Sequence, residues 1–63
     1  MLLKKGDIFY LEFDGKDVGI VRSVDMNTVD NRYRITWQKY GMRTYSYSQK
    51  DVDDWVKYPF KLL

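Results

Sequence analysis

Turn-forming residues interrupt this sequence about every ten residues, and that spacing limits the chain to short strands. The first cluster is Asp14–Asp17, the second is Asp25–Asn31, and Gly41 marks the third. The segments between them are rich in valine, isoleucine, tyrosine and threonine, which favour pleated sheets, and the chain contains no alanine. The sequence therefore predicts an all-β fold in which consecutive strands pair as hairpins.

Four strands, a short helical turn and a closing strand are expected in that order. The first four strands are predicted at residues 7–13, 18–24, 32–38 and 42–48. Ser48 and Asp51 have the spacing of a weak capping box, so a helix of one or two turns begins there. Its apolar residues at helical spacing are Val52, Trp55 and Val56, which would tuck Trp55 against the sheet. Pro59 ends the helix and suits an edge or closing strand.

The core of so short a chain must come from its aromatic residues. The 63 residues form one domain (1–63), which buries only about 60% of the surface that the unfolded chain exposes. Cysteine and histidine are absent from the sequence, so neither disulfides nor the usual zinc ligand pairs can stabilise it. Aromatic residues make up 17% of the chain, and each ring buries roughly 150–250 Å².

The turn length of the first hairpin decides which of its residues face the core. A two-residue turn at Asp14-Gly15 and a four-residue turn at Asp14–Asp17 give the same side-chain parity. The shorter turn would set Glu12 opposite Asp17, a like-charge pair, so we favour the longer one. Both turns place the same five residues on one face, and these are the predicted core: Phe9, Leu11, Phe13, Val18 and Ile20.

The second hairpin contains the stretch RITWQKYGMRTYSYSQ, in which basic and aromatic residues interleave. A two-residue loop at Tyr40-Gly41 would expose a basic and aromatic face. A three-residue loop at 39–41 instead turns most of the aromatic residues inward, with the pairs Tyr33–Tyr47, Ile35–Tyr45 and Trp37–Arg43. The longer loop separates apolar from polar residues and puts glycine where φ is positive, so we favour it. Arg43 would then cover Trp37 with its aliphatic stem or by a cation–π contact.

The predicted element order resembles the Src-homology-3-like (SH3-like) barrels, especially Tudor and KOW-type modules. The matching stretches are KKGDIFYLEFDGKDVGIVRSV (residues 4–24) and the SQKDVDDWV turn (residues 48–56) before the last strand. The resemblance implies a small, strongly bent, five-stranded SH3-like barrel with one helical turn before the last strand. Members of this superfold bind peptides, methylated side chains, nucleic acids, or ribosomal and polymerase partners, so the resemblance selects no single function.

The sequence offers no pattern of residues that points to catalysis, a cofactor or a metal. It contains no glycine-rich phosphate loop, and no nucleophile–base pair stands out. Asp51, Asp53 and Asp54 suit the N-terminus of a helix, where acidic side chains complement the dipole. The Asp25–Asp30 loop lacks the central glycine and the terminal glutamate of a calcium loop. We therefore expect a non-enzymatic module without a cofactor.

The first functional hypothesis is docking on a larger protein partner, as an accessory or inhibitory factor of the kind that viruses also encode. Tyrosine, tryptophan and arginine dominate protein interfaces. The candidate partner-binding residues are Tyr10, Trp37, Tyr40, Arg43 and Tyr58. Tyr40 stands out because a large aromatic residue at a hairpin tip has little core to reach.

The alternative hypothesis is a nucleic-acid-binding module that uses a basic face. Its candidate residues are Arg22, Arg32, Arg34 and Lys39. The net charge of +2 is small for such a role, and acidic residues are interspersed. The apolar ends MLL and KLL allow a monomer or a weak homodimer. Without a signal peptide or an apolar span, we expect a cytoplasmic protein that does not use a membrane.

Overall fold

The computed structural model describes residues 1–26, 30–39 and 41–63. This part of the chain forms a five-stranded antiparallel sheet with the order β4-β3-β2-β1-β5. The strands are β1 (Ile8–Glu12), β2 (Lys16–Asp25), β3 (Arg32–Trp37), β4 (Arg43–Ser48) and β5 (Phe60–Leu62). A helix, α1 (Gln49–Asp54), and a 3-10 turn, η1 (Trp55–Lys57), connect β4 to β5. The predicted all-β fold with one short helix before the last strand is confirmed.

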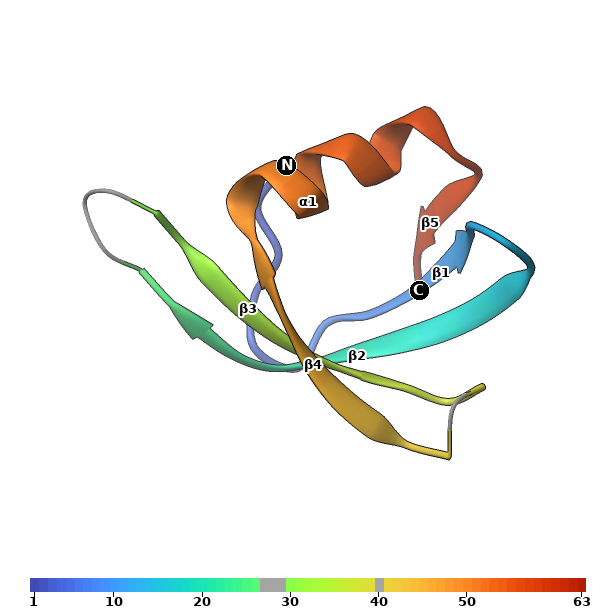
Figure 1. The fold of residues 1–63 in the computed structure, drawn as a ribbon, viewed down its shortest axis with the longest axis horizontal. Helices are drawn as coiled ribbons and strands as arrows, with labels where there is room; N and C mark the ends of the chain where they lie inside the picture. The colour runs from blue at the N-terminus through green and yellow to red at the C-terminus, as the bar shows by residue number, and fades with distance from the viewer. Residues whose placement is uncertain (27–29, 40) are drawn as a thin grey trace.

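The helical segment lies across one face of the bent sheet (Figure 1). We call this the inner face and the opposite one the outer face. The core lies between the inner face and the helical segment, where Phe9 stacks on Trp55 with 5.7 Å between ring centroids. Among the described residues, the buried apolar side chains are Leu3, Phe9, Leu11, Val21, Tyr33, Ile35, Trp37, Val52 and Trp55. Seven of these nine come from the strands or the segment before them, so the helix covers a core that the sheet largely supplies.

The predicted closure into a barrel is not confirmed, because the sheet is open. In the described residues β4 and β5 are its two edges and do not pair with each other. The chain turns away as soon as β4 ends, because Ser48 and Asp51 form the predicted capping box: the Asp51 amide donates to Ser48 Oγ and the Ser48 amide donates to the Asp51 carboxylate. The helical segment therefore carries the chain from one edge of the sheet to the other (Figure 1).

The predicted register of the first hairpin is wrong. Glu12 pairs with Lys16 and Phe9 pairs with Gly19, so the turn has three residues, 13–15, rather than two or four. Asp14 and Gly15 both adopt positive φ, 53° and 106°, which an aspartate tolerates and a glycine adopts freely. An odd turn length reverses the parity of the second strand relative to the first.

This register changes the core. Phe9 and Leu11 face inward as predicted, but Val18 and Ile20 lie on the outer face, and Phe13 is in the turn with 56% of its surface exposed. Gly19 takes the inner position opposite Phe9. A Cβ at Gly19 would lie 2.5 Å from Cζ of the Phe9 ring, so the ring packs directly on the glycine backbone.

The predicted register of the second hairpin is confirmed by three pairs: Tyr33–Tyr47, Ile35–Tyr45 and Trp37–Arg43. Gly41 adopts the predicted positive φ, 65°. Tyr40, which we placed at the tip of this hairpin, lies outside the described residues. The aromatic residues of β3 and β4 therefore share the inner face.

The helical prediction is right for Val52 and Trp55, which are buried, and wrong for Val56, which is 60% exposed. The α-helix ends at Asp54, and the tighter 3-10 turn that follows changes the rotation per residue, which takes Val56 off the buried face.

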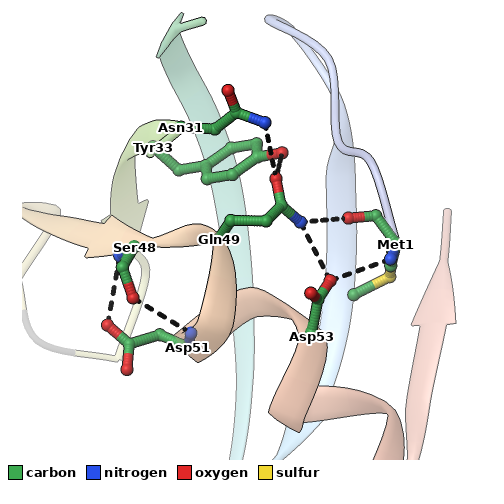
Figure 2. Close-up of polar contacts among 7 residues, drawn as sticks. All are labelled: Met1, Asn31, Tyr33, Ser48, Gln49, Asp51 and Asp53. Atoms are coloured by element: carbon green, nitrogen blue, oxygen red, sulfur yellow. Dashed lines mark hydrogen bonds and ion pairs between the residues drawn. The ribbon is translucent and has the colours of Figure 1, made fainter. Parts of the chain in front are cut away.

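A hydrogen-bond network centred on Gln49 ties α1 to β3 and to the start of the chain (Figure 2). The side-chain oxygen of Gln49 accepts from the Tyr33 hydroxyl at 2.5 Å and from Asn31 Nδ2 at 3.0 Å. Its side-chain nitrogen donates to the Met1 carbonyl at 2.6 Å and to Asp53 at 2.9 Å, and the Met1 amino group binds the same Asp53 oxygen. The network fixes the helix over one half of the inner face.

Candidate binding pocket on the inner face

The half of the inner face that lies beyond the helix contains a pocket of about 340 Å³. The turn of the first hairpin and the inner side of β3 and β4 border it, and Trp55 of η1 closes its deep end. Its lining residues are Leu11, Phe13, Asp14, Gly15, Asp17, Trp37, Lys39, Tyr45, Tyr47 and Trp55. The volume is at the lower end of the usual range for ligand pockets, about 300–1,000 Å³. It suits a side chain or a small group rather than a cofactor.

Three aromatic rings form the wall of the pocket and hold one another in place. The rings of Trp37, Tyr47 and Trp55 meet edge to face, with centroid distances of 5.1–6.0 Å. The indole nitrogen of Trp37 also donates a hydrogen bond of 2.6 Å to the Tyr47 hydroxyl. Edge-to-face contacts and a partly buried hydrogen bond leave these rings little freedom, so the wall is formed before any ligand arrives.

Exposure of the aromatic residues increases from the deep end of the pocket to its mouth. Trp37 and Trp55 are 6% and 9% exposed, whereas Tyr45 is 45% exposed and Phe13 is 56% exposed. The ring of Tyr58 packs edge to face against the ring of Phe13, with 4.8 Å between the ring centroids. Large apolar side chains on both sides of an open pocket are typical of a binding surface.

Polar groups join the two hairpins at the same end of the pocket. The Asp17 carboxylate accepts hydrogen bonds from the backbone amides of Val18 at 2.8 Å and Lys39 at 2.9 Å. The Lys39 ammonium reaches across to the carbonyl of Asp14, 3.3 Å away. These contacts fix the distance between the first hairpin and the end of β3, and with it the width of the pocket.

Tyr47 presents a hydroxyl inside the pocket. Burial raises the pKa of Tyr47 above its usual value, and the hydrogen bond from Trp37 offsets part of that rise. Its hydroxyl is therefore neutral at physiological pH. It accepts from Trp37, and no described residue accepts its hydrogen, so that hydrogen can be donated to a ligand.

The predicted docking residues do not all meet at this pocket. Trp37 lines it, Arg43 lies opposite Trp37 at the start of β4, and Tyr58 supports Phe13. Tyr10 lies on the outer face, where its hydroxyl is 3.2 Å from the Glu12 carboxylate. Tyr40 lies outside the described residues. The structure thus brings Trp37, Arg43 and Tyr58 to one side of the sheet and places Tyr10 on the other.

The predicted nucleic-acid residues are also divided. Arg32 and Arg34 point to the outer face of β3, and Arg22, at a bulge in β2, donates to Thr36 on that face at 3.0 Å. Lys39 lies at the opposite end of β3 and belongs to the pocket. Three of the four residues therefore share one surface.

Sequence reasoning missed most of the pocket. We assigned Tyr45, Tyr47 and Trp55 to the core, and they do face inward, but the helix ends before it covers Tyr45. Phe13 and the turn aspartates were missed because their position depends on a three-residue turn. The Asp14-Gly15 pair is the one sequence signal for that turn, because aspartate and glycine both tolerate the positive φ that they adopt here.

The acidic residues of the helical segment, Asp51, Asp53 and Asp54, have contacts other than a metal ion. Asp51 caps the helix, Asp53 binds the Met1 amino group, and Asp54 lies 3.4 Å from Lys57. Within residues 1–26, 30–39 and 41–63, no three acidic side chains cluster in a way that could hold a metal ion. In the same residues, none of the helical segments is long and apolar enough to cross a bilayer.

No family model, curated protein or solved structure matches the chain. The geometry of the pocket and the chemistry of its lining are therefore the basis for assigning a function.

Proposed function

We propose that this chain is a non-enzymatic docking module that binds a larger protein through the inner-face pocket. The observation that carries the proposal is the gradient of exposure: two buried tryptophans form the deep end, and Tyr45 and Phe13 remain open at the mouth. Burying more of its aromatic rings would stabilise a fold of this size, so the exposure of Tyr45 and Phe13 suits a surface that a partner covers.

The composition and rigidity of the pocket support the same conclusion. Tyrosine and tryptophan contribute most strongly to protein interfaces when they lie in a preformed, desolvated pocket. The edge-to-face packing of Trp37, Tyr47 and Trp55 lowers the entropic cost of binding, because these rings are already ordered. The element order is also compatible with a distant relation to SH3-like modules, which dock on partners in several ways.

We infer that the module acts as an accessory or an inhibitory factor whose effect depends on the surface it covers. The proposal assigns no reaction to the pocket, because Asp17 and Lys39, two of the charged groups at its edge, already bind backbone groups.

Co-purification with quantitative mass spectrometry tests the proposal. Tagged wild-type protein is compared with Tyr45→Ala, which alters the mouth of the pocket, and with Arg34→Ala, a control on the outer face. We expect a specific partner that is retained by wild type and Arg34→Ala and is lost, at least tenfold, with Tyr45→Ala. A partner that Tyr45→Ala retains at unchanged affinity would show that docking uses another surface.

A second candidate function, nucleic-acid binding, is favoured by one observation: Arg22, Arg32 and Arg34 share the outer face of the sheet. Three arginines can contact a few phosphates, and such binding weakens steeply as salt increases. A titration with a short oligonucleotide at low and physiological salt separates the two functions. Absence of binding at low salt would rule out the second candidate and leave the first unaffected.

A further inference from the structure

The charges at the mouth of the pocket are unequal. Asp14 and Asp17 contribute two carboxylates, and Lys39 contributes one ammonium. Among the described residues neither carboxylate has an ion-pair partner, and one oxygen of Asp17 accepts both of that side chain's hydrogen bonds. The edge of the pocket therefore retains carboxylate oxygens that can accept from a ligand, and the surplus charge there is negative.

A cation of the chain itself already lies at this edge. The Lys39 ammonium donates to the Asp14 carbonyl, and it lies so close to Gly15 that a Cβ there would be 2.7 Å from its nitrogen. The gap between the two hairpins thus accommodates a positively charged group. The same gap has no cationic group other than Lys39 among the described lining residues.

The aromatic wall favours the same type of ligand. The faces of tryptophan and tyrosine carry negative electrostatic potential and attract cations, most strongly where water is excluded. Trp37, Tyr47 and Trp55 offer such rings at the deep end, and the exposed ring of Tyr45 continues the wall toward the mouth. An anionic ligand would meet both the ring faces and the two carboxylates, which disfavours it.

We propose that the occupant of the pocket is an arginine side chain of the partner, packed against the aromatic wall with its guanidinium at the carboxylates of Asp14 and Asp17. This inference rests on the proposed docking function and names the chemistry of the partner. Arginine fits better than lysine, because its planar guanidinium both stacks on aromatic rings and donates to several acceptors at once. The hydrogen of the Tyr47 hydroxyl can bind a backbone carbonyl next to that arginine.

Nuclear magnetic resonance on the full chain tests the inference with short blocked peptides, Gly-Ser-Xaa-Ser-Gly. The central residue is arginine, its neutral isostere citrulline, lysine, norleucine or phenylalanine. The indole resonances of Trp37 and Trp55 report on the pocket, and these are the chain's two tryptophans. A single anchor residue is expected to bind with a Kd of ~1 mM, which calls for peptide concentrations up to ~10 mM.

We expect the arginine peptide to shift both indole resonances and to bind at least tenfold more tightly than the citrulline peptide. Asp14→Asn should weaken arginine binding at least threefold and leave citrulline binding unchanged. This substitution keeps the turn, because asparagine tolerates the positive φ at this position. Asp25→Asn, which removes the same charge from the opposite end of β2, should change neither affinity.

Equal binding of arginine and citrulline, or tighter binding of norleucine or phenylalanine, would overturn the inference and identify an apolar occupant. That result would leave the docking function intact. Absence of any shift in the indole resonances with all five peptides would also overturn it. The docking function is judged separately, by whether Tyr45→Ala loses the co-purifying partner.

Discussion

The two halves of the inner face use the same kind of side chain for different purposes. Under the helical segment, Phe9 and Tyr33 are completely buried in one core cluster with Val52 and Trp55 of that segment. Beyond the helix, Tyr45 and Phe13 have no such cover and border a pocket. An aromatic residue on this sheet is therefore core or binding surface according to whether the helical segment reaches it.

Substitution of Phe9 by alanine should give the largest loss of stability. Its ring packs against Trp37, Trp55 and Phe60 at 5.3–5.7 Å, so removing it opens a cavity at the centre of the core. We expect a loss of about 3–5 kcal/mol, which would unfold most of a domain this small. Urea denaturation monitored by circular dichroism measures this loss of unfolding free energy.

Tyr45→Ala is the matched comparison in the open half of the face. It should cost less than about 1 kcal/mol, because a half-exposed ring loses little burial. Similar losses for Phe9→Ala and Tyr45→Ala would contradict the distinction between the two halves.

Gly19→Ala should cause the next largest loss of stability in the half of the inner face that the helical segment covers. The new methyl group would overlap the Phe9 ring, which must move within a packed core. We expect a cost of about 1–3 kcal/mol by thermal or urea unfolding. Gly41→Ala is the informative control, since nothing lies within 4 Å of its Cβ position and only its positive φ of 65° opposes the change. An unchanged stability for Gly19→Ala would show that Phe9 does not pack on this backbone.

Ser48→Ala should destabilise α1, the helix that covers part of the inner face. It removes the side chain that caps α1, and loss of such a cap costs about 1 kcal/mol. Ser46→Ala, on the exposed outer side of β4, makes the matched control and should be neutral within about 0.5 kcal/mol. If the two variants were equally stable, the capping box would not hold the helix in place.

The smallest effect concerns pH. The hydrogen bond from the Met1 amino group, followed by the one from Gln49, lowers the pKa of Asp53 below its usual value. An aspartate with a lowered folded pKa stabilises the fold above its unfolded pKa, near 3.9, and this contribution is lost as pH falls through the folded pKa. Asp53→Asn should therefore show a weaker decline of the urea midpoint than wild type between about pH 5 and pH 2. An identical decline in the two proteins would show that Asp53 does not contribute to the pH dependence of stability.

How well the sequence predicts each hairpin depends on its turn. In the second hairpin one glycine and a clear separation of apolar from polar residues select the register, and the observed pairs agree. In the first, Asp14 shares the left-handed conformation with Gly15, and the turn has three residues instead of the expected two or four, which moves Val18 and Ile20 outward. The Asp14-Gly15 pair alone does not distinguish a three-residue turn from a turn of two or four residues.

Only part of the pocket could be predicted from the sequence. Trp37 was chosen because tryptophan dominates interfaces, and its neighbours Tyr45 and Tyr47 follow from the register of the second hairpin. Their exposure depends on where the helix ends, and the pocket also needs the turn at 13–15 to face β4. Both depend on how the sheet bends, a tertiary property that strand patterns do not encode.

Hydroxyl-radical footprinting of the partner complex tests the central claim most directly, because it reports side-chain exposure on each face separately. Tyr45 and Phe13 represent the open half of the inner face, and Ile8 and Leu63 are exposed apolar residues away from the pocket. We predict that oxidation of Tyr45 and Phe13 falls in the complex and that oxidation of Ile8 and Leu63 stays the same. Protection of Ile8 and Leu63 with unchanged oxidation of Tyr45 and Phe13 would contradict the account.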